Sequence, residues 1–211
     1  MTHPDYDQMR RAMVDSQLRP NTISEPRLLT VLSEVPRERF VPEAARVAAY
    51  IDRPVPLGGG RWLNAPLATA RLISEARPTA TDRVLVIGSA TGYAAAVLAP
   101  LVASVTALEE DAALTPVATD GVTFVSGPLA AGWAAGGPYD LIVIDGAVEA
   151  VPAAVSEQLV DGGRLATGLV ERGVTRLAIG RRAGNGFGLV TVADAEAVIL
   201  PGFAAPPTFT F

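Results

Sequence analysis

The chain of 211 residues contains no cysteine and a single histidine, His3. Without cysteine there are no disulfides, no thiolate metal sites and no cysteine nucleophile. One histidine near the start of the chain argues against a Ser-His-Asp triad and against a metal site built from several histidines. We therefore predict that the protein has no metal site.

Long apolar runs and an excess of positive charge are also lacking. Apolar segments such as 84–87 and 141–144 have the length of a strand, well short of a bilayer-spanning helix. Lys and Arg total 17 against 22 Asp and Glu, and no basic run offers a surface for nucleic-acid phosphates. Residues 1–8 are polar and acidic, unlike a signal peptide. We expect a cytoplasmic protein with neither a nucleic-acid nor a membrane partner; nothing in the sequence indicates an oligomeric state.

Hydrophobic residues make up 49% of the chain, enough to form a folded core. The length suits a single α/β domain over 1–211. Within it we expect a helical N-terminal extension over 1–80 and a Rossmann-like core over 81–211. Helices are predicted over 5–19 and 66–76, and another over 24–34 with Ser24 as its N-cap.

From residue 83 onward, apolar runs alternate with helical patterns, which predicts a parallel sheet covered on both faces. An Asn-Gly pair within 181–186 then predicts an antiparallel hairpin. A mostly parallel seven-stranded sheet with an antiparallel C-terminal hairpin resembles the layout of class I methyltransferases, which use S-adenosylmethionine. The expected strands are 83–87, 104–108, 122–125, 139–144, 164–168, 175–180 and 188–199, and the expected helices are 92–100, 111–117 and 152–160.

A glycine-rich turn, Gly88-Ser-Ala-Thr-Gly92, follows the first of these strands, and Glu109 ends the next strand 21 positions after Gly88. This layout is typical of a nucleotide-type cofactor site. The G-x-G-x-x-G dinucleotide pattern fits poorly. The G-x-G-x-G pattern of methyltransferases fits at two of three glycines, with Ala90 at the centre; if that position needs positive φ, the strain is about 1 kcal/mol or more. We expect cofactor contacts from Gly88, Ser89, Ala90 and Gly92, with Glu109, or alternatively Glu110, holding the ribose. The alternative is a tight strand-to-helix connection without a ligand.

Several collinear segments resemble protein-L-isoaspartate O-methyltransferases. Met13-Val-Asp-Ser-Gln-Leu18 is similar to that family's "MVxxQL" opening, and Val35-Pro-Arg-Glu-Arg-Phe-Val-Pro42 to its "VPRExFVP". Ala49-Tyr-Ile-Asp52 with Pro56–Gly60 resembles "AYxD…PIGxG", and 87–99 resembles "IGTGSGYxAAVLA". Residues 139–144 and Gln158–Leu165, the latter resembling "QLxxGGxL", extend the match. Together these segments cover nearly the whole chain, from about residue 9 to 203.

The resemblance implies S-adenosylmethionine-dependent methylation of the side-chain carboxylate of L-isoaspartyl residues in damaged proteins or peptides. Such an acceptor is already ionised at neutral pH, so it needs no general base. The enzyme mainly aligns donor and acceptor, which can lower the barrier greatly. The lack of a triad or a metal cluster is therefore compatible with this activity.

The chain departs from the family at the expected site. Where the family has "QTISQP", this chain has Arg61-Trp-Leu-Asn-Ala-Pro66. Asn64 takes the serine position and is our predicted catalytic residue, orienting the acceptor carboxylate, while Trp62 takes the threonine position as a packing or a substrate-contact residue. Pro128 replaces the aspartate of "GDG", which the family uses at the adenine end, and Val86 replaces the acidic residue of "LEIG".

Asp145 is a further cofactor-binding candidate because it follows the apolar run 141–144, at the carboxyl end of a strand. Its alternative role is that of an N-cap or turn residue before Gly146. Two other functions stay open. One is a non-catalytic homologue that acts as a binding or regulatory module, motivated by Ala90, Pro128 and Asn64. The other is a methyltransferase for a different small molecule.

Overall fold

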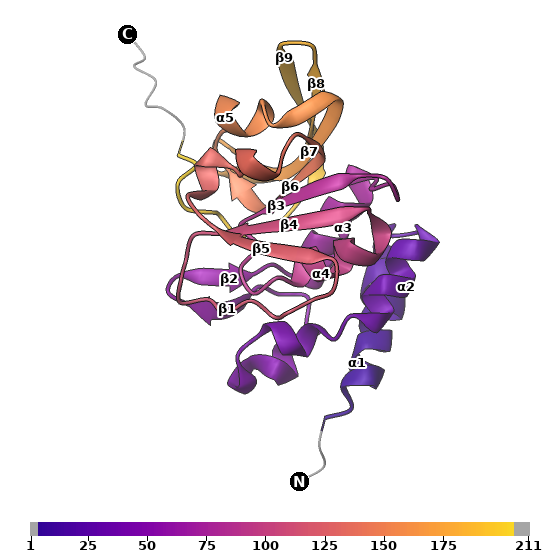
Figure 1. Ribbon diagram of the computed structural model, residues 1–211. Helices are drawn as coiled ribbons and strands as arrows, with labels where there is room; N and C mark the ends of the chain where they lie inside the picture. The colour runs from indigo at the N-terminus through magenta and orange to yellow at the C-terminus, as the bar shows by residue number, and fades with distance from the viewer. Residues whose placement is uncertain (1–3, 205–211) are drawn as a thin grey trace.

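A computed structural model of the chain describes residues 4–204, so His3 and the tail 205–211 lie outside the described residues (Figure 1). The N-terminal segment is helical, as predicted. Helix α1 (Tyr6–Met13) continues through a π-helical turn (Val14–Leu18) and a 3-10 turn (Arg19–Asn21); α2 (Pro26–Glu34) and 3-10 turns at Arg37–Phe40 and Glu43–Ala48 follow.

Helix α2 begins later than the sequence predicts, and Ser24 is not its N-cap. Glu25 is the cap, and its carboxylate accepts hydrogen bonds from the backbone N–H groups of Arg27 and Leu28. Pro26 follows at the first helical position, where a missing N–H costs nothing. Because a glutamate side chain reaches the free N–H groups of the first turn, the helix needs no serine there.

A small antiparallel pair follows the N-terminal helices in the sequence. Strands β1 (Val55–Gly58) and β2 (Arg61–Leu63) form this two-stranded sheet, and α3 (Pro66–Ala76) follows as predicted. Side chains alternate along β2: Arg61 and Leu63 are buried, whereas Trp62 is 44% exposed. Trp62 therefore does not fill the core, and Arg61 points inward.

The main sheet has seven strands, which confirms the prediction of a mostly parallel sheet with an antiparallel C-terminal hairpin. Strands β3 to β7 run parallel in the order β5-β4-β3-β6-β7, and β8 is antiparallel to β7 and β9. The turn between β8 and β9 consists of Gly184 and Asn185, with φ of +56° at the glycine. The strands are β3 (Arg83–Ile87), β4 (Ser104–Glu109), β5 (Val122–Ser126), β6 (Tyr139–Val148), β7 (Leu159–Glu171), β8 (Val174–Ala183) and β9 (Gly186–Asp194).

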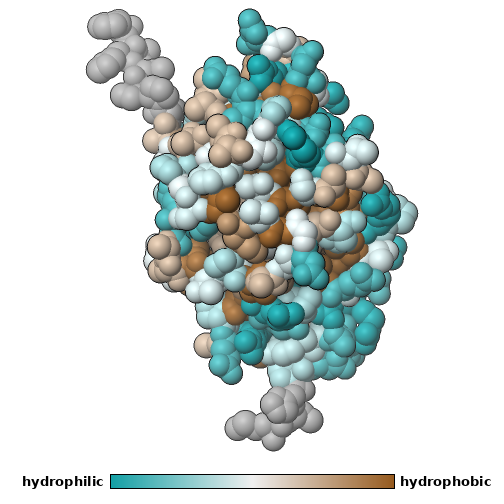
Figure 2. All heavy atoms as spheres, in the orientation of Figure 1, coloured by the Kyte–Doolittle hydropathy of each residue, from teal (hydrophilic) through white to brown (hydrophobic). Residues whose placement is uncertain are grey.

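Helices cover the two faces of this sheet unequally. On one face α3 and α4 (Tyr93–Leu98) pack against the strands, and one hydrophobic cluster joins Met13, Leu32 and Leu72 to Val84 of β3. This shared core supports our proposal of a single domain. On the other face, a second cluster joins α5 (Ala153–Ser156) and short 3-10 turns to Leu200 and Phe203 from the chain after β9. Figure 2 shows apolar residues across the middle of the side in view.

The predicted helix over 111–117 is wrong, and that over 152–160 is reduced to α5. At the first site a single turn closes where Leu114 N–H donates to the Asp111 carbonyl. Pro116 then lacks an N–H and disfavours helical geometry at the residue before it, so the turn cannot extend. After α5 the chain enters β7 at Leu159, which pairs with Tyr139. The helix predicted over 92–100 is α4 followed by a 3-10 turn (Ala99–Leu101).

Candidate functional site

The glycine-rich turn adopts left-handed backbone geometry at every second residue. The φ angles are +73° at Gly88, +48° at Ala90 and +99° at Gly92. For Ala90 this conformation costs about 1 kcal/mol or more, and its N–H donates to Oε2 of Glu109 at 2.7 Å. The condition stated for Ala90, a positive φ, thus applies, and a charge-assisted hydrogen bond offsets the strain.

Leu200, from the chain after β9, lies against this turn. A Cβ on Gly88 would sit 2.7 Å from Leu200 Cδ1, so glycine is required for space as well as for φ. The segment carrying Leu200 runs beside β6: Ala147 N–H donates to the Val198 carbonyl at 2.7 Å, and Leu200 N–H to the Ala147 carbonyl at 2.9 Å. A Cβ on Gly92 would similarly lie 2.9 Å from the ring of Phe124.

Glu109 is a largely buried carboxylate of the site, with a side chain 11% exposed. Its Oε1 accepts the backbone N–H groups of Glu110 at 3.0 Å and Asp111 at 3.1 Å. Its Oε2 accepts the Ala90 N–H and a hydrogen bond from Nη2 of Arg61 at 2.6 Å. Four donors thus occupy a carboxylate that has about four lone-pair sites.

Glu110, the alternative ribose ligand, lies differently. It is exposed, and its Oε2 accepts the Leu129 N–H at 3.3 Å. Pro128, which replaces the family's adenine-side aspartate, is exposed beside it. The resemblance implies an adenine contact at this position. The nearest backbone N–H there is that of Leu129, and it is already bonded to Glu110. Ser89 is buried, and its hydroxyl has no hydrogen-bond partner among the described residues.

Asn64 and Asp145, 81 positions apart in the sequence, are joined at the carboxyl end of β6. Asn64 Nδ2 donates to the Asp145 carbonyl at 3.0 Å and to its Oδ1 at 2.9 Å, while Asn64 Oδ1 accepts the Val198 N–H at 2.8 Å. Both side chains are buried. Burial raises the pKa of Asp145, opposed by the Asn64 hydrogen bond and by the charges of Arg37 and Arg61.

Asp145 is neither an N-cap nor a turn residue, because β6 continues past it to Val148. The pairing of β6 with β7 is irregular between Val143 and Ala147, and this irregularity includes Asp145. A buried acid at a strand irregularity, bonded to a buried amide, is an arrangement typical of functional sites rather than of sheet cores.

Two arginines of the site, Arg37 and Arg61, were not predicted from the sequence. Arg37 is fully buried: its Nε donates to the Ala49 carbonyl at 2.7 Å, and its Nη2 donates to the Asn64 carbonyl. Its guanidinium lies 4.5 Å from the centre of the Tyr93 ring, and burial lowers its pKa. Arg61 is the partner of Glu109. Side chains alternate between the two faces of a short strand that begins at Arg61, and this alternation could have indicated that the Arg61 side chain points inward.

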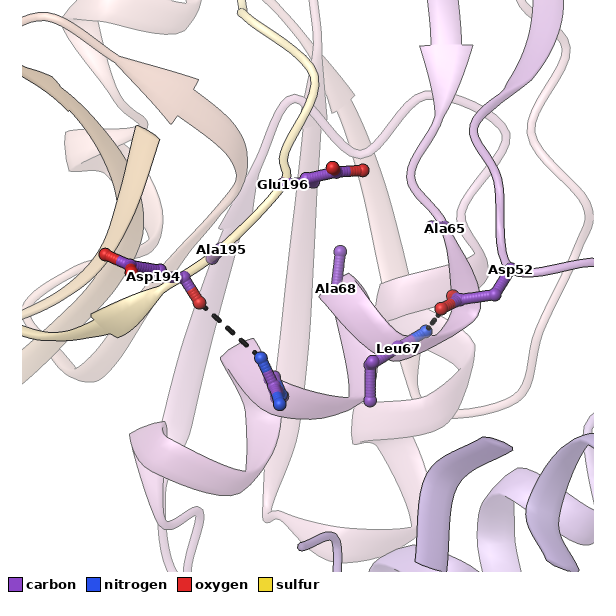
Figure 3. A pocket seen from close by; sticks show the side chains of 8 residues that line it. Asp52, Ala65, Leu67, Ala68, Asp194, Ala195 and Glu196 are labelled. Carbon is purple, nitrogen blue, oxygen red and sulfur yellow. Dashed lines mark hydrogen bonds between the residues drawn. The ribbon is translucent and has the colours of Figure 1, made fainter. Parts of the chain in front are cut away.

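An open cavity of about 390 Å³ lies at the start of α3 (Figure 3). Asp52 accepts the Leu67 N–H there at 3.0 Å, and Arg71 donates to the Asp194 carbonyl at 3.5 Å. A smaller cavity shares part of this lining and reaches Asn64. The larger cavity is lined by Asp52, Ala65, Leu67, Ala68, Arg71, Asp194, Ala195 and Glu196.

The fold thus brings the glycine turn, Glu109, Asn64 and Asp145 to the carboxyl ends of β3, β4 and β6. Their roles toward a ligand remain predictions. Within residues 4–204, no group of three or more potential ligand side chains is placed to hold a metal ion. Over the same residues, no helix is both long and apolar enough to cross a membrane.

A seven-stranded sheet of this kind, with a glycine turn after β3 and a buried carboxylate ending β4, defines a class I methyltransferase fold. A family model described as "Protein-L-isoaspartate(D-aspartate) O-methyltransferase" matches residues 8–199. The chain belongs to this family.

Curated relatives agree with that assignment, and a solved structure shares the fold. The chain is 40% identical over 171 residues to protein-L-isoaspartate O-methyltransferase 2 of Marinobacter nauticus, covering 76% of this chain and 77% of the relative. It is 34% identical over 193 residues to the Methanoregula boonei protein-L-isoaspartate O-methyltransferase, covering 88% of each. A crystal structure of a Plasmodium falciparum protein of that name, in complex with S-adenosyl-L-homocysteine, matches the fold with a TM-score of 0.76 at 16% identity, over 94% of this chain and 99% of the other.

Proposed function

We propose that the protein transfers the methyl group of S-adenosylmethionine to the side-chain carboxylate of L-isoaspartyl residues in damaged proteins and peptides, a repair reaction. The family match over residues 8–199 carries this proposal. The retained turn at Gly88 and the buried carboxylate of Glu109 support it, because both lie at the strand ends where ligands bind in α/β sheets.

The residues present fit this cofactor at its sugar end. The turn 88–92 carries no bulky side chain of its own at its three left-handed positions, and Glu109 is an acceptor of the right chemistry for ribose hydroxyls. At the adenine end the fit rests on the backbone around Leu129, because Pro128 supplies no N–H. Gly88, Ser89, Ala90, Gly92 and Glu109 are therefore the proposed cofactor residues.

The cofactor, when bound, supplies a methyl group on a sulfonium that an ionised carboxylate can attack without a base. The work left to the protein is alignment. Asn64 is the proposed orienting residue, because an amide N–H can donate to the acceptor carboxylate. Its N–H group already donates to Asp145, so the acceptor has to take over part of that hydrogen bonding.

The test uses two synthetic peptides that differ in one linkage, isoaspartyl in one and ordinary aspartyl in the other. With methyl-labelled S-adenosylmethionine, we expect base-labile label on the isoaspartyl peptide alone. Equal labelling of both peptides, or of neither, contradicts the proposed acceptor. A cytoplasmic location is part of the proposal, and cell fractionation tests it.

One observation favours a second candidate, a methyltransferase for a different small molecule. The buried Asp145 carboxyl already bonds to Asn64, in the way an acceptor carboxylate would. A second carboxylate there meets like charge whenever Asp145 is ionised. Binding of S-adenosylhomocysteine without methylation of the isoaspartyl peptide would favour this candidate.

A further inference from the structure

The four hydrogen bonds to Glu109 are of two kinds. Three come from backbone N–H groups, at Ala90, Glu110 and Asp111, and the local chain path fixes them. The fourth comes from the side chain of Arg61, which is 48 residues away in the sequence. Since a carboxylate has about four lone-pair sites, a new donor can bind only where an existing one leaves. The side chain is the one that can leave without unfolding the turn.

Among the described residues, the Arg61 side chain makes one hydrogen bond, to Glu109. It is 7% exposed, and it makes an ion pair with Glu109 at 2.6 Å. Its Nε is buried without a hydrogen-bond partner among the described residues. It is carried by the three-residue strand β2, which pairs with β1 and not with the main sheet. The charge of Arg61 also acts on Asp145, so two buried acids share this cation.

From this geometry we propose that Arg61 competes with the cofactor ribose for Glu109, so that this chain binds S-adenosylmethionine only after its own ion pair opens. Arg61 is therefore a residue that sets cofactor affinity, by weakening it. The inference rests on the proposed function only in taking S-adenosylmethionine as the ligand. Breaking a buried ion pair is costly because both charges lose their partner, and that cost is subtracted from the binding free energy.

The test is calorimetric titration of the full chain with S-adenosylhomocysteine, comparing wild type with Arg61→Gln. Glutamine lacks the charge and is the family's residue at this position in the "QTISQP" segment. We expect the Arg61→Gln variant to bind about 10- to 100-fold more tightly, the range of a charge-assisted hydrogen bond. The matched control is Arg164→Gln, which breaks the ion pair with Asp82, a buried residue on the loop before β3. This control loses a comparable ion pair outside the site, and we expect its affinity to stay within about twofold of wild type.

The outcomes separate the two proposals. Tighter binding by Arg61→Gln alone, or binding by Arg61→Gln where wild type shows none, supports the competition. Binding by wild type with equal or weaker binding by Arg61→Gln overturns the competition and leaves the proposed function intact. No heat from any variant at millimolar ligand overturns both and points to a non-catalytic module.

A second measurement needs no folded variant. In wild-type protein labelled with nitrogen-15 arginine, the buried Arg61 Nε–H gives a side-chain NMR signal of its own. Saturating S-adenosylhomocysteine should move this signal toward that of an exposed arginine and speed its exchange with solvent. Ligand binding that leaves the Arg61 signal unchanged refutes the competition.

Discussion

Replacing Gly88 by alanine tests how tightly the chain after β9 is packed onto the glycine turn. The new Cβ would lie 2.7 Å from Leu200 Cδ1, and Leu200 has little room to retreat because it is buried and packs closely against Gly146. The left-handed φ of +73° adds about 1–2 kcal/mol for alanine. Overpacking adds about 1–3 kcal/mol. We therefore expect Gly88→Ala to lower the free energy of unfolding by about 2–5 kcal/mol.

The matched control is Gly162→Ala. Gly162 has nearly the same φ, +75°, but nothing lies within 4 Å of its Cβ position. Gly162→Ala should lower the free energy of unfolding only by the cost of the left-handed backbone conformation, about 1–2 kcal/mol. Urea denaturation measures both variants and, with Leu200→Ala, completes a double-mutant cycle. Removing the leucine should recover about 1–3 kcal/mol of the Gly88→Ala cost. Equal costs for the two glycine variants, or an additive cycle, would refute the packing argument.

Three other predictions concern the acceptor side. The pKa of Asp145 is raised in the folded state, so this group makes wild type lose stability as pH rises from the ordinary aspartate value of 3.8 through the raised pKa. The stability of Asp145→Asn relative to wild type should therefore increase over that window. If urea titrations give the same difference in unfolding free energy from about pH 4 to pH 8, this reasoning is wrong. Asn64→Ala leaves the Val198 N–H and the Asp145 carboxyl without a partner, and should cost about 2–4 kcal/mol in chemical denaturation; a loss below about 1 kcal/mol sinks the role of this amide in joining the segments. Trp62→Thr should change stability by less than about 1 kcal/mol, because Trp62 is half exposed; a melting temperature lower by more than about 4 °C would show that it packs after all.

Most of the fold could be predicted from local patterns. Continuous apolar runs located the strands, and their alternation with helical segments fixed a parallel sheet, because each run has to be buried on both faces. The errors arose where one residue outweighs a pattern. Pro116 stopped a helix after a single turn, and Glu25 replaced Ser24 as a cap because its carboxylate accepts the N–H groups of Arg27 and Leu28.

The contacts between site residues could be predicted only where they are local in sequence. Gly88 and Glu109 belong to one strand–helix–strand unit, so their spacing alone brings them together. The bonds of Asn64 to Asp145 and of Arg61 to Glu109 span 81 and 48 residues. These two contacts depend on where α3 and strands β1 and β2 pack against the main sheet. Spacing in the sequence does not predict that packing.

The segment 198–200 ties both halves of the site to one short piece of backbone. Val198 donates to Asn64 on the acceptor side, and Leu200 covers Gly88 on the cofactor side. Two hydrogen bonds to Ala147 hold this segment in place. Any displacement of these few residues would therefore act on Gly88 and on Asn64 together, because both contact the same short segment.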